Sequence, residues 1–465
     1  MGELNSLLQE VGLLADPSEP FEVPAEEVVE ALTGFHPKAP QTLREVPVAP
    51  ELIESLVLKF LMNRGCAPGR DIGEQLGLPF RVMAEKLLEM KREQLVAHRC
   101  ASGMNDFMYE LTQEGHLRAK RASETTTYFG ALPVSLEEYI RSVDAQSLQK
   151  QKPTPQDLMA ALEDLTLPSK TMGQIGQAVR AARAMFLFGS PGNGKTSIAQ
   201  RITAAFGDEI WLPKSISVDG EIVRVFDPVV HEPLPMANAN EVDHRWIRIK
   251  RPTITAGGEL TLENLEMTVV GTTGIVEAPL QLKSNCGVLL IDDFGRQRCS
   301  PTDLLNRWIV PLETQVDFLN MPSGKKVRVP FEQMIVFSTN LAPKDLVDEA
   351  FLRRIPYKVE APDPTQEEFK RVFGIVAKKM GIRFDEGAYR HLLLQHYAPN
   401  PERPAARGFR YCHVRDLLTQ IKTLCEFHSQ TPVMTPQTID MAVENYFVSY
   451  GLDDDPNATC AVKAG

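Results

Sequence analysis

The 465-residue sequence predicts an α/β fold whose core is a parallel β-sheet, and three segments carry this prediction. A short apolar segment, Met185–Phe188, runs into a glycine-rich loop and then into an amphipathic helix. Two further apolar segments, Gly287–Ile291 and Met334–Thr339, are each followed directly by a polar side chain. Continuous apolar runs of this length are typical of strands buried in a parallel sheet. We therefore expect the second strand to deliver its acidic end beside the glycine-rich loop.

The glycine-rich loop has the pattern of a phosphate-binding loop, because residues 189–196 fit G-x-x-x-x-G-K-[ST] in full. Its glycines allow successive backbone N–H groups to face a polyphosphate, and the following helix adds its positive end. We expect Lys195 to supply a point charge and Thr196 to offer its hydroxyl to Mg²⁺. The chain is therefore expected to bind a nucleotide, and the predicted binding residues in the loop are Gly189, Pro191, Gly192, Asn193, Gly194, Lys195, Thr196 and Ser197.

Polar residues at the two other strand ends complete a predicted catalytic site. Asp292 fits the Walker B aspartate, which holds Mg²⁺ through water, so Thr196 and Asp292 are the predicted metal-binding residues. Asp293 stands where a carboxylate polarises the attacking water. Asn340, at the end of the third segment, can contact the γ-phosphate or that water.

Two adjacent arginines end a short helical segment that starts at Glu349. If Arg353 or Arg354 reached the γ-phosphate bound to a neighbouring subunit, its guanidinium would neutralise charge that develops in the transition state. A pair of arginines alone is more typical of a solvated face. The order of the motifs along the chain favours the catalytic interpretation.

In this order the motifs resemble those of the AAA+ ATPases, over residues 154–450. The resemblance rests on Walker A (Gly189–Thr196), Walker B (Leu289–Asp293), sensor 1 (Asn340) and the arginine-finger box (Phe351–Arg354). Helical segments near 365–379, 386–396 and 412–428 resemble the small α-helical lid of that family. Residues 412–418 match the lid's sensor 2 motif, which places Arg415 over the nucleotide. The resemblance implies ATP and Mg²⁺ as cofactors and a ring of subunits, a hexamer, with ATP between neighbours.

Two segments resemble the MoxR-like and enhancer-binding branches of the family. Residues 278–293 look like their helix-plus-Walker-B unit, and residues 316–331 look like the β-hairpin before sensor 1. The long stretch 211–276 is expected to be an insertion, either toward the ring's pore or as a surface elaboration. Asp293 replaces the family's usual glutamate, so a slow enzyme and a non-hydrolysing switch both stay open.

Residues 48–122 are predicted to form three helices, a β-hairpin and a final helix, which resembles a winged helix-turn-helix domain. DNA binding needs a basic face, yet residues 51–121 contain eleven Lys and Arg against ten Asp and Glu. The third helix contains Arg81, Lys86, Lys91 and Arg92, interrupted by Glu85 and Glu89. Docking to protein and binding to DNA through residues 51–121 both stay open.

Composition and the spacing of residues set the remaining expectations. The net charge of −11 gives no general attraction to nucleic acid or anionic membranes, and no apolar run is long enough to cross a bilayer. Seven scattered cysteines without a C-x-x-C pair predict no cysteine zinc site and indicate reduced thiols in a cytoplasm. The predicted parts outside residues 48–122 are a Pro-rich acidic arm at 1–47, a linker at 123–152, an α/β domain at 153–360, a helical lid at 361–450 and a flexible tail at 451–465.

The preferred interpretation is a Mg²⁺-dependent ATPase that assembles into a ring and remodels a protein complex whose identity the sequence does not indicate. The alternatives are a DNA-directed ATPase for loading or regulation and a non-hydrolysing nucleotide switch.

Overall fold

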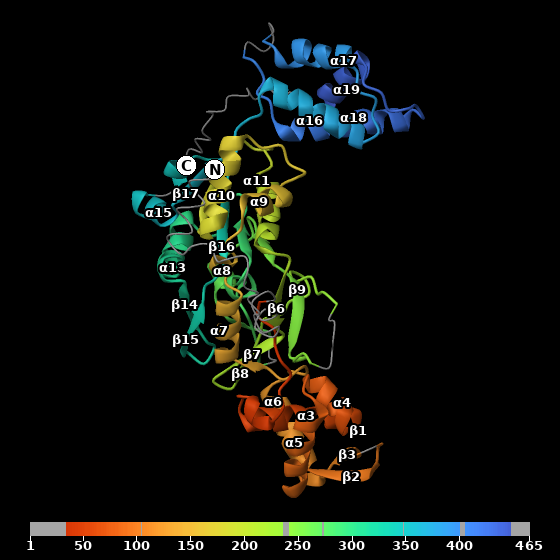
Figure 1. Ribbon diagram of the computed structural model, residues 1–465, viewed down its shortest axis with the longest axis vertical. Coiled ribbons are helices and arrows are strands. Elements are labelled where there is room, and N and C mark those ends of the chain that lie inside the picture. The colour runs from red at the N-terminus through yellow and green to blue at the C-terminus, as the bar shows by residue number, and fades with distance from the viewer. Residues whose placement is uncertain are drawn as a thin grey trace, which may run out of the picture.

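The computed structural model describes residues 34–447 except residues 104, 236–240, 272–273, 347 and 400–404. Most of the arm predicted at 1–47 and all of the tail predicted at 451–465 therefore lie outside the described residues. The described chain forms three parts along the long axis of the molecule (Figure 1). An N-terminal unit, coloured red and orange, and a C-terminal helical bundle, coloured blue, lie at opposite ends, with a β-rich middle part between them.

The middle part is built on a five-stranded sheet with the strand order β10-β13-β16-β5-β17, in which every neighbouring pair is parallel. Every residue of β13 and β16 is buried, because helices pack on both faces of the sheet. The α/β P-loop fold predicted from the sequence is confirmed. The core strands are β5 (Met185–Phe188), β10 (Thr253–Ala256), β13 (Val288–Ile291), β16 (Met334–Thr339) and β17 (Tyr357–Glu360).

Helices of the core follow local sequence signals. Thr154 and Asp157 form a capping box at the start of α9, and Pro155 takes the first helical position. Ser300 caps α13 in the same way, by accepting from the N–H of Asp303. The helical elements are α9 (Pro155–Ala161), α10 (Ser169–Ala181), α11 (Lys195–Arg201), η2 (Ile202–Phe206), α12 (Leu280–Lys283), α13 (Pro301–Thr314), α14 (Pro343–Leu346) and α15 (Glu349–Arg354).

A second β-layer joins the core to the N-terminal unit. It contains the sheet β11-β12-β8-β7-β4, the antiparallel pair β6–β9 and the hairpin β14–β15. The hairpin predicted within 316–331 is confirmed, with Val316 opposite Pro330. The strands are β4 (Val134–Ser135), β6 (Glu209–Pro213), β7 (Ser215–Val218), β8 (Glu221–Arg224), β9 (Trp246–Lys250), β11 (Thr268–Val269), β12 (Ile275–Glu277), β14 (Val316–Asn320) and β15 (Lys326–Pro330), with the short helix η3 (Leu262–Leu265).

One predicted range needs correction, and the predicted linker contains regular structure. The range 211–276 is not one insertion, because β10 lies inside it and pairs with β13 in the core sheet. The Thr-Ile-Thr-Ala sequence of this edge strand lacks the continuous apolar run that marks the other core strands. The linker predicted at 123–152 contains a helix, α7 (Leu136–Ala145), that fully buries Tyr139, and a short strand, β4, that pairs with β7. A short helix, α8 (Leu148–Gln151), follows.

The N-terminal unit contains the three helices, hairpin and final helix that the sequence predicts. An additional short strand, β1, pairs with β3 to give a three-stranded antiparallel sheet. Ile222 of β8 packs against the core of this unit. The elements are η1 (Leu43–Glu45), α3 (Pro50–Arg64), β1 (Cys66–Pro68), α4 (Gly69–Leu76), α5 (Phe80–Arg92), β2 (Val96–Ala101), β3 (Phe107–Leu111) and α6 (Gln113–Thr125).

The C-terminal bundle has one helix more than the three segments predicted. Thr435 caps the additional helix, α19, and Pro436 occupies its first position. Among the described residues, none of the helices combines the length and apolar character needed to cross a membrane. The bundle consists of α16 (Gln366–Lys379), α17 (Glu386–His391), the π-helical segment η4 (Leu392–Tyr397), α18 (Tyr411–Phe427) and α19 (Pro436–Tyr446).

Candidate nucleotide site

The phosphate-binding loop joins β5 to α11, and two of its glycines are required by its conformation. Gly189 has φ of 140° and Gly192 has φ of 85°, values that side-chain-bearing residues rarely adopt. A Cβ at Gly189 would collide with the carbonyl oxygen of Ala361, and a Cβ at Gly192 would collide with the sulfur of Cys412. The loop therefore passes close to the residues that lead into, and begin, the helical bundle.

Lys195 lies at the centre of the predicted site. Its Nζ donates to the carbonyl oxygens of Gly189 and Ser190, both at 2.9 Å, and to Oδ1 of Asn340 at 2.7 Å. Burial lowers the pKa of Lys195, while the nearby carboxylates Asp292 and Asp293 act in the opposite direction. An ammonium group held by three oxygens at the loop is placed to exchange them for phosphate oxygens.

The predicted metal-binding residues touch each other. Oγ1 of Thr196 donates to Oδ2 of Asp292 at 2.9 Å. A hydroxyl and a carboxylate oxygen are hard oxygen donors, which Mg²⁺ takes together with water and phosphate oxygens. The residues present therefore fit a Mg²⁺ ion bound beside a nucleotide.

Asp293 and Asn340 also lie together, since Nδ2 of Asn340 donates to Oδ1 of Asp293 at 3.4 Å. Asp293 has φ of 49°, in the left-handed region that aspartate tolerates better than most residues. This conformation is a physical reason for aspartate where the resembled family usually has glutamate. The sequence analysis missed Gln297, whose Nε2 holds this turn by donating to the carbonyls of Asp292 at 2.8 Å and Asp293 at 3.2 Å. No motif marks Gln297, because its contacts depend on the geometry of the turn.

The other loop residues connect the site to the segment after β17. Asn193 is buried and donates from Nδ2 to Oδ1 of Asp363 at 2.6 Å and to the carbonyl of Ala361 at 3.3 Å. Gly194 precedes α11 in a left-handed conformation, and Ser197 lies in the first turn of that helix. Pro191 is exposed, as expected for a residue at the tip of the loop.

The placement of Arg415 over the nucleotide stays a prediction, since among the described residues its recorded partner is not a loop residue. Its side chain is 77% exposed and pairs with the adjacent Asp416 at 3.4 Å. Instead, Arg410 donates from Nη1 to the carbonyl of Pro191 at 3.2 Å, and the N–H of Cys412 donates to the carbonyl of Gly192 at 2.9 Å. Because α18 begins at Tyr411, its first residues face the loop and Arg415 lies one turn further along.

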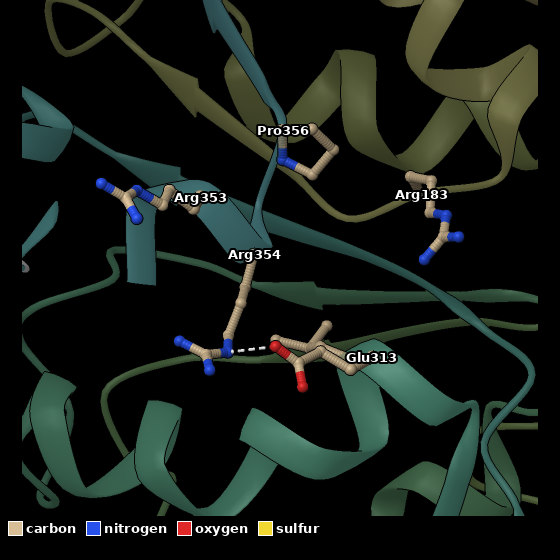
Figure 2. Close-up of a pocket in the computed structure, with 6 residues that line it drawn as sticks. Arg183, Glu313, Arg353, Arg354 and Pro356 are labelled. Carbon is tan, nitrogen blue, oxygen red and sulfur yellow. Dashed lines mark ion pairs between the residues drawn. The ribbon is translucent and has the colours of Figure 1, made fainter. Parts of the chain in front are cut away.

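The two candidate arginine fingers line a cavity of about 440 Å³. Arg354 is directed onto α13 and pairs through Nε with Oε1 of Glu313 at 2.7 Å, whereas Arg353 is turned away from that carboxylate (Figure 2). Arg353 is 79% exposed and lies 3.7 Å from Glu349. Arg183 also lines the cavity.

This cavity lies at the opposite end of the core sheet from the phosphate-binding loop. Arg183 and Pro356, which line it, precede the parallel neighbours β5 and β17, whereas the loop follows β5. A strand of four residues spans about 13 Å. The structure therefore brings Lys195, Asp292 and Asn340 together but keeps Arg353 and Arg354 apart from them within one chain.

Comparison with known proteins gives a family match for the helical bundle and similarities to solved structures over a larger part of the chain. Residues 365–445 match a family described as a domain of unknown function (DUF8689), a range that contains α16, α17 and α18 and all but the last residue of α19. No curated protein matches the chain.

Among solved structures, NtrX from Brucella abortus in complex with ADP is similar at 15% identity, with a TM-score of 0.37 over 60% of this chain and 55% of that chain. The same protein in complex with ATP is similar at 15% identity, with a TM-score of 0.37 over 70% of this chain and 62% of that chain. A RuvB mutant from Thermotoga maritima is similar at 13% identity, with a TM-score of 0.36 over 63% of this chain and 75% of that chain. The chain thus spans little more than half of the first NtrX structure.

Proposed function

We propose that this chain is a Mg²⁺-dependent ATPase of the AAA+ type that works as a ring and remodels a protein complex. The observation that carries the proposal is the meeting of Lys195, Thr196, Asp292 and Asn340 at the carboxyl ends of three adjacent strands. In open parallel sheets this edge is where ligands bind, at the strand where the connection order reverses. Here β5 lies between β16 and β17, which places the loop at that point.

In this proposal each group has a separate task. Lys195 and the loop amides bind the phosphates, and Thr196 with Asp292 holds Mg²⁺, which neutralises charge on the phosphate oxygens. Asp293 accepts a hydrogen bond from the attacking water, and Asn340 orients that water or the γ-phosphate. Gln297 acts as a positioning residue because it holds the turn that carries both aspartates. Through its hydrogen bond to Pro191, Arg410 couples the conformation of the loop to that of the helical bundle.

The ring is supported by the distance between the two halves of the site. Arg353 and Arg354 lie at the far end of β5 from their own phosphate-binding loop, which supports a role at the site of a different subunit. Such head-to-tail contacts close into rings when the rotation between subunits permits it. We propose that Arg354 or Arg353 enters the neighbour's site, in a ring of six.

An ATPase assay of the wild-type chain tests this proposal. We expect phosphate release that requires Mg²⁺ and stops on addition of EDTA, and an increase in particle mass by light scattering when ATP is present. EDTA could stop phosphate release by preventing either ATP binding or hydrolysis, so nucleotide binding is measured in parallel. Tight ATP binding without phosphate release would instead support the nucleotide switch, and a lack of ATP binding would contradict both.

Protein docking is favoured over DNA binding for the N-terminal unit because two of its lysines are withdrawn from the surface. Lys86 on α5 is 2% exposed and pairs with Glu89 at 3.1 Å. Lys59 is also buried, which lowers the pKa of Lys59 to about 8, and it donates to the carbonyl of Thr126 at 2.7 Å. Neither can contribute to a basic face.

We therefore expect that any binding of the full chain to a labelled DNA duplex at 50 mM salt is lost at about 200 mM salt. Contacts to phosphates weaken steeply over that range. Fluorescence anisotropy measures it. Binding at low salt that is lost on replacing Arg81 and Lys91 with Glu would favour the DNA-directed alternative. Replacing Lys344 and Lys378 with Glu serves as a charge-matched control outside the N-terminal unit.

A further inference from the structure

Two histidines and an aspartate in the C-terminal bundle converge on one point. Nε2 of His391 lies 2.7 Å from Oδ1 of Asp440, and Nε2 of His396 lies 2.5 Å from the same oxygen. One ligand atom from each residue falls within 4.8 Å of the others. The cluster lies in α17, η4 and α19, outside the proposed nucleotide site.

The backbone explains how both imidazoles reach the same atom. In an α-helix, residues five apart point about 140° away from each other around the axis. His391 and His396 are five apart, but the chain between them is π-helical from Leu392 to Tyr397. A π-helix closes its turn with i→i+5 hydrogen bonds, so residues five apart lie one above the other. Such turns are uncommon and are found frequently at functional sites.

The cluster is held on packed elements. Leu392 and Tyr389 on the histidine side are buried, as are Ile439 and Val443 on either side of Asp440. The three polar side chains are themselves only partly covered, with 28% of His391, 22% of His396 and 49% of Asp440 exposed. Rigid support with one open side is the arrangement of a site with three protein ligands and room for water.

The charge of the cluster also suits a cation. Nε2 of His391 and Nε2 of His396 both hydrogen-bond to Oδ1 of Asp440. Asp440 therefore presents a carboxylate to the two rings. One imidazole would be enough to hydrogen-bond with the carboxylate. With the second imidazole, the three side chains offer a cation two nitrogen ligands and one oxygen ligand.

We propose that His391, His396 and Asp440 form a binding site for a transition-metal ion of the Zn²⁺ type. Imidazole nitrogen favours Zn²⁺ and its first-row neighbours over Mg²⁺ or Ca²⁺, which prefer oxygen. Ligand atoms at Zn²⁺ distances are about 3.3 Å apart in a tetrahedron, so the present contacts need to widen by less than about 1 Å. The ion takes the place of the hydrogen between each Nε2 and the carboxylate, and each neutral imidazole then carries its proton on Nδ1. The bound ion connects η4 to α19.

Calorimetric titration of the full chain with Zn²⁺ tests the proposal. Excess Mg²⁺ is included because Thr196 and Asp292 form another place where a divalent ion binds. We expect one Zn²⁺ per chain, and a loss of affinity of at least about 100-fold in His396→Gln and in Asp440→Asn, since even residues that only support ligands cost 10–100-fold. His428→Gln, at the exposed end of α18, is the matched control and should bind as the wild type does.

Cobalt gives a second measurement that does not depend on stability. Co²⁺ bound by the wild type and by His428→Gln should show the intense visible absorption of a low-coordinate site, and the two triad variants should not. Circular dichroism shows whether each variant is folded. Equal Zn²⁺ affinity in the wild type and Asp440→Asn, or no binding to the folded wild type, would overturn the proposal and leave the cluster as a hydrogen-bonded tether.

Discussion

Replacing Asp292 with Asn is expected to lower the rate of ATP hydrolysis by at least about 100-fold while leaving ATP binding nearly intact. The asparagine oxygen can still accept the hydrogen bond from Thr196 that the structure shows at 2.9 Å, so the loop keeps its shape. The negative charge that we propose holds Mg²⁺ is lost, and with it the charge neutralisation that hydrolysis requires. Phosphate release measures the rate, and a fluorescent ATP analogue measures the affinity.

Asp219→Asn is the matched control for that substitution. Asp219 is 59% exposed, lies in the turn between β7 and β8, and has φ of 49°, which asparagine also tolerates. Its rate should equal that of the wild type. If Asp292→Asn hydrolysed ATP at the wild-type rate, the contact between Thr196 and Asp292 would be structural and the assignment of Mg²⁺ to these residues would be wrong.

The parts of the site that the sequence predicts are those whose chemistry is local. The loop at 189–196 and the apolar strands before Asp292 and Asn340 each have a pattern readable within ten residues. Their meeting follows from a rule of parallel sheets, because carboxyl ends of neighbouring strands share one edge. The contacts of Lys195 with Asn340 and of Thr196 with Asp292 were therefore predictable in kind before any distance was known.

Other features depend on tertiary contacts that no short pattern contains. β10 carries alternating Thr and apolar residues, and only its pairing with β13 makes it a core strand. The positions of Arg410 and Arg415 depend on where α18 begins and on how the bundle meets the loop. The cluster at Asp440 requires a π-helical turn and a helix more than 40 residues further along the chain than His391, so a search for cysteine spacings could not find it.

Mixing two inactive variants is the sharpest test of a site shared between subunits. Lys195→Ala removes the phosphate-binding charge, and Arg354→Ala removes the proposed finger, which in related chemistry contributes about 10³-fold or more to the rate. Each variant alone should therefore hydrolyse ATP at a very small fraction of the wild-type rate. In an equal mixture, roughly a quarter of head-to-tail interfaces join an intact loop to an intact arginine, so activity should return to about that level. Phosphate release from the mixture measures the recovery.

The physical reason for expecting recovery is that, in the proposed ring, one chain does not contain a complete site. Arg354 lies beyond the amino end of β5 and is held by Glu313, while Lys195 lies beyond the carboxyl end. Glu313 is 52% exposed, so losing its partner should cost little stability. Arg371→Ala, at an exposed position of α16, controls for removal of an arginine, and Arg353→Ala in the same mixture shows which guanidinium acts. Absence of recovery in particles shown by light scattering to contain both variants would place catalysis within single subunits, and Arg354 would then be a structural partner of α13.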